Sequence, residues 1–238
     1  MWSSACCAIV CPPDLTGVDG GLDKLLRQGR VWQAGRGSLA ASQAIPSGFA
    51  ALDACLPGGG WPRAALTELL LDTHGRGELA LVLPALVRLC TAAEAGAQPR
   101  WVCWVAPPFM PYAPALAARG LPPEFMLVVH PPGQALRGEP LWAAEQALRS
   151  GQCCAVLVWA DAVADRRLRR LQLAAEASDA WAVLFRPATA GRQPSPAALR
   201  LALDAGGVEI LKCRGARPGR LSLPLEAAGA GDCPGRPG

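Results

Sequence analysis

The sequence predicts an α/β protein whose central sheet is mainly parallel and is covered by helices on both faces. Two observations lead to this prediction. Several short runs are apolar throughout, as in strands buried on both faces, and segments with apolar residues at helical spacing lie between them. Strands and helices that alternate in this way are typical of a parallel sheet, because each crossover places a helix on one face.

The predicted elements follow one another in a regular order. Apolar runs predict strands at Ala65–Leu71, Arg100–Ala106, Phe125–His130, Ala155–Trp159, Trp181–Phe185, Leu199–Leu203 and Val208–Lys212. Helical spacing of apolar residues predicts helices at Glu78–Ala93, Ala113–Arg119, Pro140–Ser150 and Ala164–Ala177. Pro140 is placed at the first position of its helix, where a proline is well tolerated, whereas Pro84 lies inside the first helix.

The composition indicates a full core and a modest charge. Hydrophobic residues make up 51% of the 238 residues and charged residues 18%, so the chain can bury a sizeable core. The formal net charge of +4 is too small to require a nucleic-acid partner. Of the 23 basic residues only Lys24 and Lys212 are lysines, and the arginines suit phosphate or carboxylate partners, which a guanidinium group binds bidentately.

We expect one core domain with two appendages. Residues 1–44 are expected to form an N-terminal arm, residues 45–214 the core, and residues 215–238 a flexible tail rich in Gly, Pro and Ala. No apolar stretch reaches the roughly 18–20 residues of a membrane-spanning helix, and the N-terminus lacks the basic segment of a secretory signal. We therefore expect a cytoplasmic protein without membrane contact.

The ten cysteines are expected to be reduced. No C-x-x-C occurs, and the pattern favours a frayed terminus over a zinc site at Cys6, Cys7 and Cys11. Five other cysteines lie in apolar runs, where a thiol acts as a small hydrophobic group: Cys90, Cys103, Cys153, Cys154 and Cys213. We expect neither a metal nor a cofactor.

The segment before the first predicted strand contains a recognisable motif. It reads Ile45-Pro-Ser-Gly-Phe-Ala-Ala-Leu-Asp53, followed by Leu56-Pro-Gly-Gly-Gly-Trp-Pro62. It resembles the opening of a RecA-type ATPase core. The resemblance implies a RecA-like three-layer sandwich, with a phosphate-binding loop directly after the first strand.

That loop is degenerate in this chain. A phosphate-binding loop needs G-x-x-x-x-G-K-[ST], because backbone N–H groups surround the phosphates, the lysine reaches the terminal phosphate and the hydroxyl holds Mg²⁺. Gly77-Glu78 replaces the lysine–hydroxyl pair, and at roughly 4 Å a carboxylate would repel a triphosphate by one to several kcal/mol. The residues of the degenerate loop are Asp72, Thr73, His74, Gly75, Arg76, Gly77 and Glu78.

Two other parts of an ATP site are also missing. The resemblance implies a catalytic glutamate after the strand Trp101–Ala106, but Ala106-Pro-Pro-Phe-Met-Pro111 follows. It also implies an aspartate at the end of the strand Ala155–Trp159, which ends in tryptophan; Asp161 lies beyond the strand end. We therefore predict that the protein is not an enzyme. His74 has no neighbouring nucleophile or carboxylate in the sequence and is given no catalytic role.

The middle of the chain carries a second resemblance. The segments that carry it are Arg100–Pro107, Gly120–Pro122, Ala147–Gly151, Val156–Trp159, Leu173–Glu176 and Phe185–Pro187. They look like the SulA family of cell-division inhibitors, which lacks the RecA-type opening. A chain with both features resembles the ImuA family, from about Val31 to Arg217.

The ImuA resemblance implies an accessory factor in SOS-induced translesion DNA synthesis. Its implied partners are RecA, an inactive Y-family polymerase homologue and an error-prone replicative-type polymerase. It also implies a bacterial cytoplasmic protein that associates with the nucleoid after DNA damage. We expect the protein to act by protein–protein binding.

Three places are candidate contacts for a partner or for DNA. Arg166, Arg167, Arg169 and Arg170 fan across one predicted helix, where a merely solvated basic face is the alternative. The segment from Arg186 to Ser195 corresponds in the RecA resemblance to a DNA-contacting mobile loop, with Arg192 and Gln193 as phosphate contacts; an ordinary connection is the alternative. Trp61, between glycines and a proline, is either an interface anchor or packed under the first strand.

Three rival functions remain open from the sequence. The first is a SulA-like inhibitor that binds the tubulin-like division protein. The second is a divergent ATPase that uses Asp161 and Arg76 in place of the usual groups. The third is a direct DNA-binding module, whose affinity would fall steeply with salt.

Overall fold

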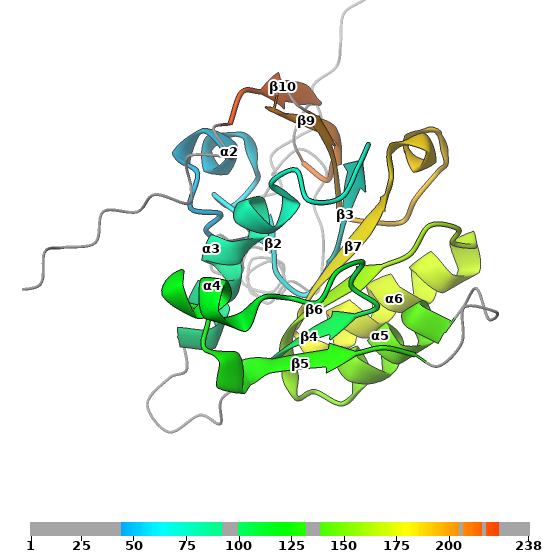
Figure 1. Cartoon of the computed structure of the whole chain (residues 1–238). Coiled ribbons are helices and arrows are strands. Elements are labelled where there is room, and N and C mark those ends of the chain that lie inside the picture. Colours follow the sequence, from blue (N-terminus) through cyan, green and yellow to red (C-terminus); the bar gives the residue numbers. More distant parts are fainter. Residues whose placement is uncertain (1–43, 92–99, 132–138, 205–206, 216–217, 224–238) are drawn as a thin grey trace, which may run out of the picture.

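The computed structural model describes residues 44–91, 100–131, 139–204, 207–215 and 218–223. An eight-stranded mixed sheet lies at the centre, in the order β10-β9-β8-β3-β7-β6-β4-β5 (Figure 1). Its strands are β3 (Leu66–Leu71), β4 (Trp101–Val105), β5 (Met126–Val129), β6 (Cys153–Trp159), β7 (Trp181–Pro187), β8 (Leu199–Asp204), β9 (Gly207–Cys213) and β10 (Gly219–Leu221). A separate two-stranded antiparallel sheet joins β1 (Ala44–Ile45) and β2 (Trp61–Pro62).

The pairing directions divide the main sheet into two parts. The six strands from β8 to β5 run parallel to their neighbours, whereas β9 and β10 continue the sheet in the antiparallel direction. The predicted α/β class is therefore confirmed, in a mixed sheet. All seven strands predicted from apolar runs are present, with ends shifted by at most a few residues.

Helices pack on both faces of this sheet. The first face is covered by α3 (Glu78–Thr91), together with the short helices α2 (Ala50–Cys55) and α4 (Ala113–Ala118). The second face is covered by α5 (Glu139–Arg149) and α6 (Asp165–Ser178). Figure 1 shows α3 and α4 on one side of the strands and α5 and α6 on the other. Two 3₁₀ segments, η2 (Pro123–Phe125) and η3 (Ala188–Arg192), complete the described elements.

The motif before β3 has a structural role. The Asp53 carboxylate accepts a hydrogen bond from the backbone N–H of buried Ser47 at 2.9 Å, which fixes the turn ahead of α2. Gly48 has φ +87° and lies against Pro84, the proline inside α3. Gly60 has no room for a side chain, because a Cβ there would come within 3 Å of the Ile45 backbone. The glycines of the motif thus allow β1, β2 and α3 to approach one another closely.

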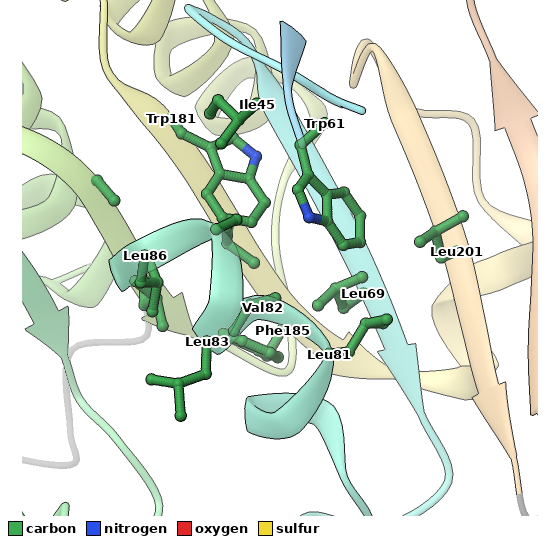
Figure 2. Close-up of a cluster of buried hydrophobic side chains, with 14 of the residues drawn as sticks. Ile45, Trp61, Leu69, Leu81, Val82, Leu83, Leu86, Trp181, Phe185 and Leu201 are labelled. Atoms are coloured by element: carbon green, nitrogen blue, oxygen red, sulfur yellow. The ribbon is translucent and has the colours of Figure 1, made fainter. Parts of the chain in front are cut away.

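Trp61 was a candidate interface anchor, and this prediction is wrong. Its side chain is completely buried on β2, and its ring centroid lies 5.2 Å from that of Trp181. Figure 2 shows the two indoles beside each other, with Ile45, Leu69 and Val82 around them. The loop-like sequence around Trp61 gave no sign of β1, which pairs with β2 and places Ile45 opposite Trp61.

Some elements were not predicted, and some predictions lie outside the described residues. The sequence gave no signal for β1, α2 or β2, nor for β10, which lies in the segment assigned to the tail and pairs with β9. The arm, apart from Ala44, and most of the tail lie outside the described residues, as do Cys6, Cys7 and Cys11.

Candidate functional site

The degenerate loop connects β3 to α3. Its residues Asp72 to Arg76 are exposed, and Gly75 and Gly77 have positive φ angles. Glu78, the first residue of α3, is buried and turns back into the loop. Its two carboxylate oxygens accept the backbone N–H groups of Gly75, at 2.6 Å, and Arg76, at 2.8 Å.

This arrangement places an internal anion at the start of a helix. Backbone N–H groups at a helix N-terminus are the usual donors to a bound phosphate. Here the N–H groups of Gly75 and Arg76, in the loop just before α3, donate to Glu78, which also lies favourably at the positive end of the helix dipole. A phosphate would have to displace a carboxylate of like charge before it reached these two amides.

The end of β4 carries no carboxylate and leads into an exposed apolar loop. Ala106 has a left-handed φ of +51°, and its N–H donates to the Val129 carbonyl at 2.8 Å. The chain then runs through Pro107, Pro108 and Pro111 to α4. Three large side chains in this loop, which we call the Pro107–Tyr112 loop, are 69–72% exposed: Phe109, Met110 and Tyr112.

Aromatic side chains stack on one another at the end of β6. Trp159 stacks on Phe185 of β7, with centroids 4.4 Å apart and planes inclined by 9°, and on Trp104 of β4 at 5.9 Å. The RecA resemblance implied a metal-binding aspartate at the position of Trp159. Asp161 is exposed, two residues beyond the strand.

A buried polar network lies on the second face of the sheet, beside α6. Glu68, in the middle of β3, is fully buried, and its carboxylate accepts Arg200 Nε at 2.7 Å and Ser195 Oγ at 2.9 Å. Arg186 Nη1 lies 3.6 Å from the same carboxylate, and Arg186 Nη2 donates to Gln193 at 2.8 Å. Burial lowers the pKa of nearby Lys212, which donates to the Ser195 carbonyl at 2.6 Å.

Arg186 was predicted to contact a partner or DNA, and this prediction is wrong, because only 1% of its side chain is exposed. The predicted mobile loop after it is anchored instead. Arg200 donates to the carbonyls of Ala190 and Gln193, each at 2.9 Å. The segment therefore covers the sheet, which favours the alternative of an ordinary connection; Arg192 and Gln193 remain exposed on it.

The four arginines of α6 differ in their surroundings. Arg166 and Arg169 are exposed and Arg167 is half-buried. Arg170 points toward α5, where its Nη2 lies 2.9 Å from the carboxylate of Glu145. The structure thus brings Arg170 together with a neighbouring helix and leaves Arg166 and Arg169 available at the surface.

Four cysteines are buried within the sheet and α3, as the apolar runs predicted: Cys90, Cys103, Cys153 and Cys154. They interact in pairs on opposite faces. A hydrogen bond with the Cys154 thiol raises the pKa of Cys90, and the same contact lowers the pKa of Cys154. A hydrogen bond between Cys103 and Cys153 likewise raises the pKa of Cys103 and lowers that of Cys153.

Among the described residues, no three His, Cys, Asp or Glu side chains are grouped as a metal site requires. In the same part of the chain, no helix has both the length and the apolar character needed to span a bilayer.

Sequence reasoning missed the exposed apolar residues. Phe109, Met110 and Tyr112 lie in the Pro107–Tyr112 loop, Trp142 on α5 and Leu173 on α6. The closely spaced prolines were a signal for the loop, because they prevent its apolar residues from entering a helix or a central strand.

Comparison with known proteins gives relatives of two kinds. No model of a known protein family matches the chain. The chain is 29% identical over 229 residues to Protein ImuA of Caulobacter vibrioides, covering 84% of this chain and 91% of the relative, in both strains compared. It is 34% identical over 109 residues to Cell division inhibitor SulA of Edwardsiella piscicida, covering 46% of this chain and 60% of the relative. The solved structure of SulA from Pseudomonas aeruginosa matches 51% of this chain and 97% of its own, with 24% identity and a TM-score of 0.40.

Proposed function

The chain belongs to the ImuA family, and on that premise we propose that it is a non-catalytic, RecA-like accessory protein in SOS-induced translesion DNA synthesis. It acts by binding other proteins. Its likeness to Protein ImuA and to Cell division inhibitor SulA supports an accessory role in the response to DNA damage. The proposed site of action is the bacterial cytoplasm, with association with the nucleoid after damage.

The observation that carries this proposal is the Pro107–Tyr112 loop. Phe109, Met110 and Tyr112 stand together at the surface, each about 70% exposed. Contiguous exposed apolar groups mark protein-interaction sites, and aromatic and methionine side chains are enriched there. Three neighbouring prolines restrict the backbone, so little conformational entropy is lost when the loop binds.

The geometry of the degenerate loop supports the non-catalytic part of the proposal. Glu78 already accepts two of the amides that a phosphate would use, and the loop carries no lysine. At the ends of β4 and β6, Ala106 and Trp159 stand where an ATPase of the RecA type needs carboxylates. A protein with this site would use the scaffold for binding, without nucleotide hydrolysis and without a cofactor.

The proposed partners are RecA and translesion polymerase components, including an inactive Y-family polymerase homologue and an error-prone replicative-type polymerase. The test is co-purification with crosslinking from bacterial cells after DNA damage, using the tagged full chain. We expect at least one of these proteins to be recovered. Replacing Phe109, Met110 and Tyr112 together by serine should lower its recovery by about tenfold or more, the effect of losing roughly 1.4 kcal/mol or more of binding free energy.

The matched control is Leu127→Ser, which removes an exposed apolar side chain from β5, outside the loop. It should leave recovery unchanged. Recovery of neither RecA nor any translesion polymerase component would overturn the proposal. ATP turnover by the purified protein that Asp161→Asn abolishes would overturn its non-catalytic part and support the divergent ATPase.

A second candidate function is inhibition of cell division. The likeness to Cell division inhibitor SulA, over 46% of the chain, favours it. The purified protein would then block polymerisation of the tubulin-like division protein at near-stoichiometric amounts, as followed by light scattering. Unimpaired polymerisation would leave the translesion role as the proposal.

A further inference from the structure

The outer surface of α5 and α6 combines exposed apolar side chains with arginines. Trp142 on α5 is 55% exposed and Leu173 on α6 is 63% exposed. We call this region the α5–α6 surface, and it consists of Trp142, Leu173, Arg149, Arg166, Arg167, Arg169 and Arg170. The two helices lie next to each other on the second face of the sheet (Figure 1), whereas α4, which follows the Pro107–Tyr112 loop, packs on the first face.

The charges on this surface do not balance among the described residues. Arg149 and Arg170 share one acidic partner, the buried carboxylate of Glu145, whose Oε1 lies 2.9 Å from Nη2 of each. Arg166, Arg167 and Arg169 make no ion pair with any other described side chain. Asp165, in the first turn of α6, and Glu176, three residues after Leu173, add two exposed carboxylates, and Glu176 lies 3.9 Å from Arg214. The described side chains of the two helices thus include five arginines and three carboxylates, so the surface has an excess of positive charge.

The apolar members distinguish this surface from a basic face that is only solvated. Leu173 lies one turn of helix beyond Arg169 and Arg170, so its exposed side chain has guanidinium groups on its N-terminal side. Arginine forks bind carboxylates bidentately, and indole and leucine side chains bind apolar groups. A ligand that complements all of these carries both carboxylates and large apolar side chains.

A nucleic acid complements this surface only in part. Its phosphates would satisfy the arginines and an unpaired base could stack on Trp142, but neither group gives the aliphatic side chain of Leu173 an apolar partner. A protein segment can carry carboxylates and large apolar side chains a few residues apart. The observations therefore favour a protein partner over DNA.

We propose that the α5–α6 surface binds an acidic segment of a protein partner, with its carboxylates on Arg166 and Arg169 and its large apolar side chains on Trp142 and Leu173. This inference rests on the proposed function, because it names the chemistry of a second partner surface. Together with the Pro107–Tyr112 loop it gives the molecule two separate places for binding. An accessory protein that joins two partners needs both.

Binding of defined peptides to the full chain tests the proposal, by fluorescence anisotropy. The probe is a labelled twelve-residue peptide that contains four Asp and two Phe, compared with a peptide in which Ser replaces both Phe and with a single-stranded oligonucleotide of about the same charge. We expect the Asp/Phe peptide to bind, the Asp/Ser peptide to bind about tenfold more weakly, and binding to weaken as salt is raised.

Variants locate the binding on the surface. The double variant Arg166→Glu/Arg169→Glu and the double variant Trp142→Ser/Leu173→Ser should each weaken binding of the Asp/Phe peptide about tenfold or more. All four side chains are exposed, so both variants should fold, as circular dichroism will verify. Arg119→Glu, a charge reversal at an exposed arginine after α4, is the matched control and should not change the affinity.

Exchanging the charges on both partners tests for a gain of binding, which a misfolded variant would not show. The Arg166→Glu/Arg169→Glu variant should gain affinity for a peptide with Lys in place of Asp and the same two Phe residues. The proposal would be overturned if the Asp/Phe and Asp/Ser peptides bound equally, or if neither peptide bound. It would also be overturned if the oligonucleotide bound more tightly than the peptides and the same variants lost that binding. Any of these results leaves co-purification through the Pro107–Tyr112 loop unaffected, so the two tests fail independently.

Discussion

Arg200 Nε donates to the carboxylate of Glu68 at 2.7 Å, and both side chains are buried within the sheet. Arg186 approaches the same carboxylate only to 3.6 Å, and its Nε has no hydrogen-bond partner among the described residues. One buried anion is thus shared unequally by two buried cations. The two arginines are therefore expected to contribute very differently to stability.

Arg200→Met should destabilise the protein by about 3–5 kcal/mol, because it leaves the Glu68 charge poorly compensated and removes the donors to Ala190 and Gln193. Arg186→Met is the matched control, since it makes the same substitution at an equally buried position. It should cost less, about 1–2 kcal/mol, because Glu68 keeps Arg200 as its close partner and the main loss is the hydrogen bond from Arg186 to Gln193. Urea unfolding measures both, and equal losses would contradict the unequal sharing.

A second prediction concerns two tryptophans in opposite environments. Trp61→Ala removes a fully buried indole that packs on Trp181, and it should lower the free energy of unfolding by about 3–5 kcal/mol. Trp142→Ala removes an indole that is more than half exposed, and it should change stability by no more than about 0.5 kcal/mol. Thermal or urea unfolding distinguishes them. A small change in the free energy of unfolding for Trp61→Ala would contradict its assignment to the core and favour the alternative of an interface residue.

The main elements were predictable because their apolar pattern is local. Each strand from β3 to β9 contains enough apolar residues, in a run or interrupted by single polar residues, to be recognised without knowledge of its neighbours. β1, β2 and β10 are two or three residues long, and they exist because of pairing with distant residues, such as Gly219 with Ile210. Such pairing leaves no local signature in a sequence rich in Gly and Pro.

The candidate site was less predictable, for a related reason. The burial of Arg186 depends on Glu68, which lies in a mostly apolar strand. A carboxylate in the middle of such a strand was the available signal, because a buried charge requires a partner of opposite sign. For Phe109 and Met110 the neighbouring prolines indicated a loop, but not that the side chains would be exposed, since apolar residues in a loop can still fold back onto the core.

A third prediction tests the close approach at the start of the core. A Cβ on residue 60 would lie 2.2 Å from the Ile45 carbonyl oxygen, which is backbone and cannot move aside as a flexible side chain could. Gly60→Ala should therefore destabilise the protein by about 1–3 kcal/mol or more. Gly219→Ala on β10, where a Cβ meets no atom within 4 Å, should leave stability unchanged or slightly higher. An unchanged unfolding midpoint for Gly60→Ala would show that β1 and β2 can separate at little cost.

The last prediction concerns the internal anion of the degenerate loop. Glu78→Ala removes the acceptor of the Gly75 and Arg76 amides and should cost about 0.5–2 kcal/mol, as the loss of a helix cap does. The two amides should then exchange with solvent about tenfold faster or more in hydrogen-exchange measurements, since their protection comes from that carboxylate. Glu78→Gln retains an oxygen acceptor of the same size and should show a smaller increase. Unchanged exchange at Gly75 and Arg76 in the alanine variant would mean that the loop keeps its conformation without Glu78. The hydrogen bonds to Glu78 would then not be what protects these amides.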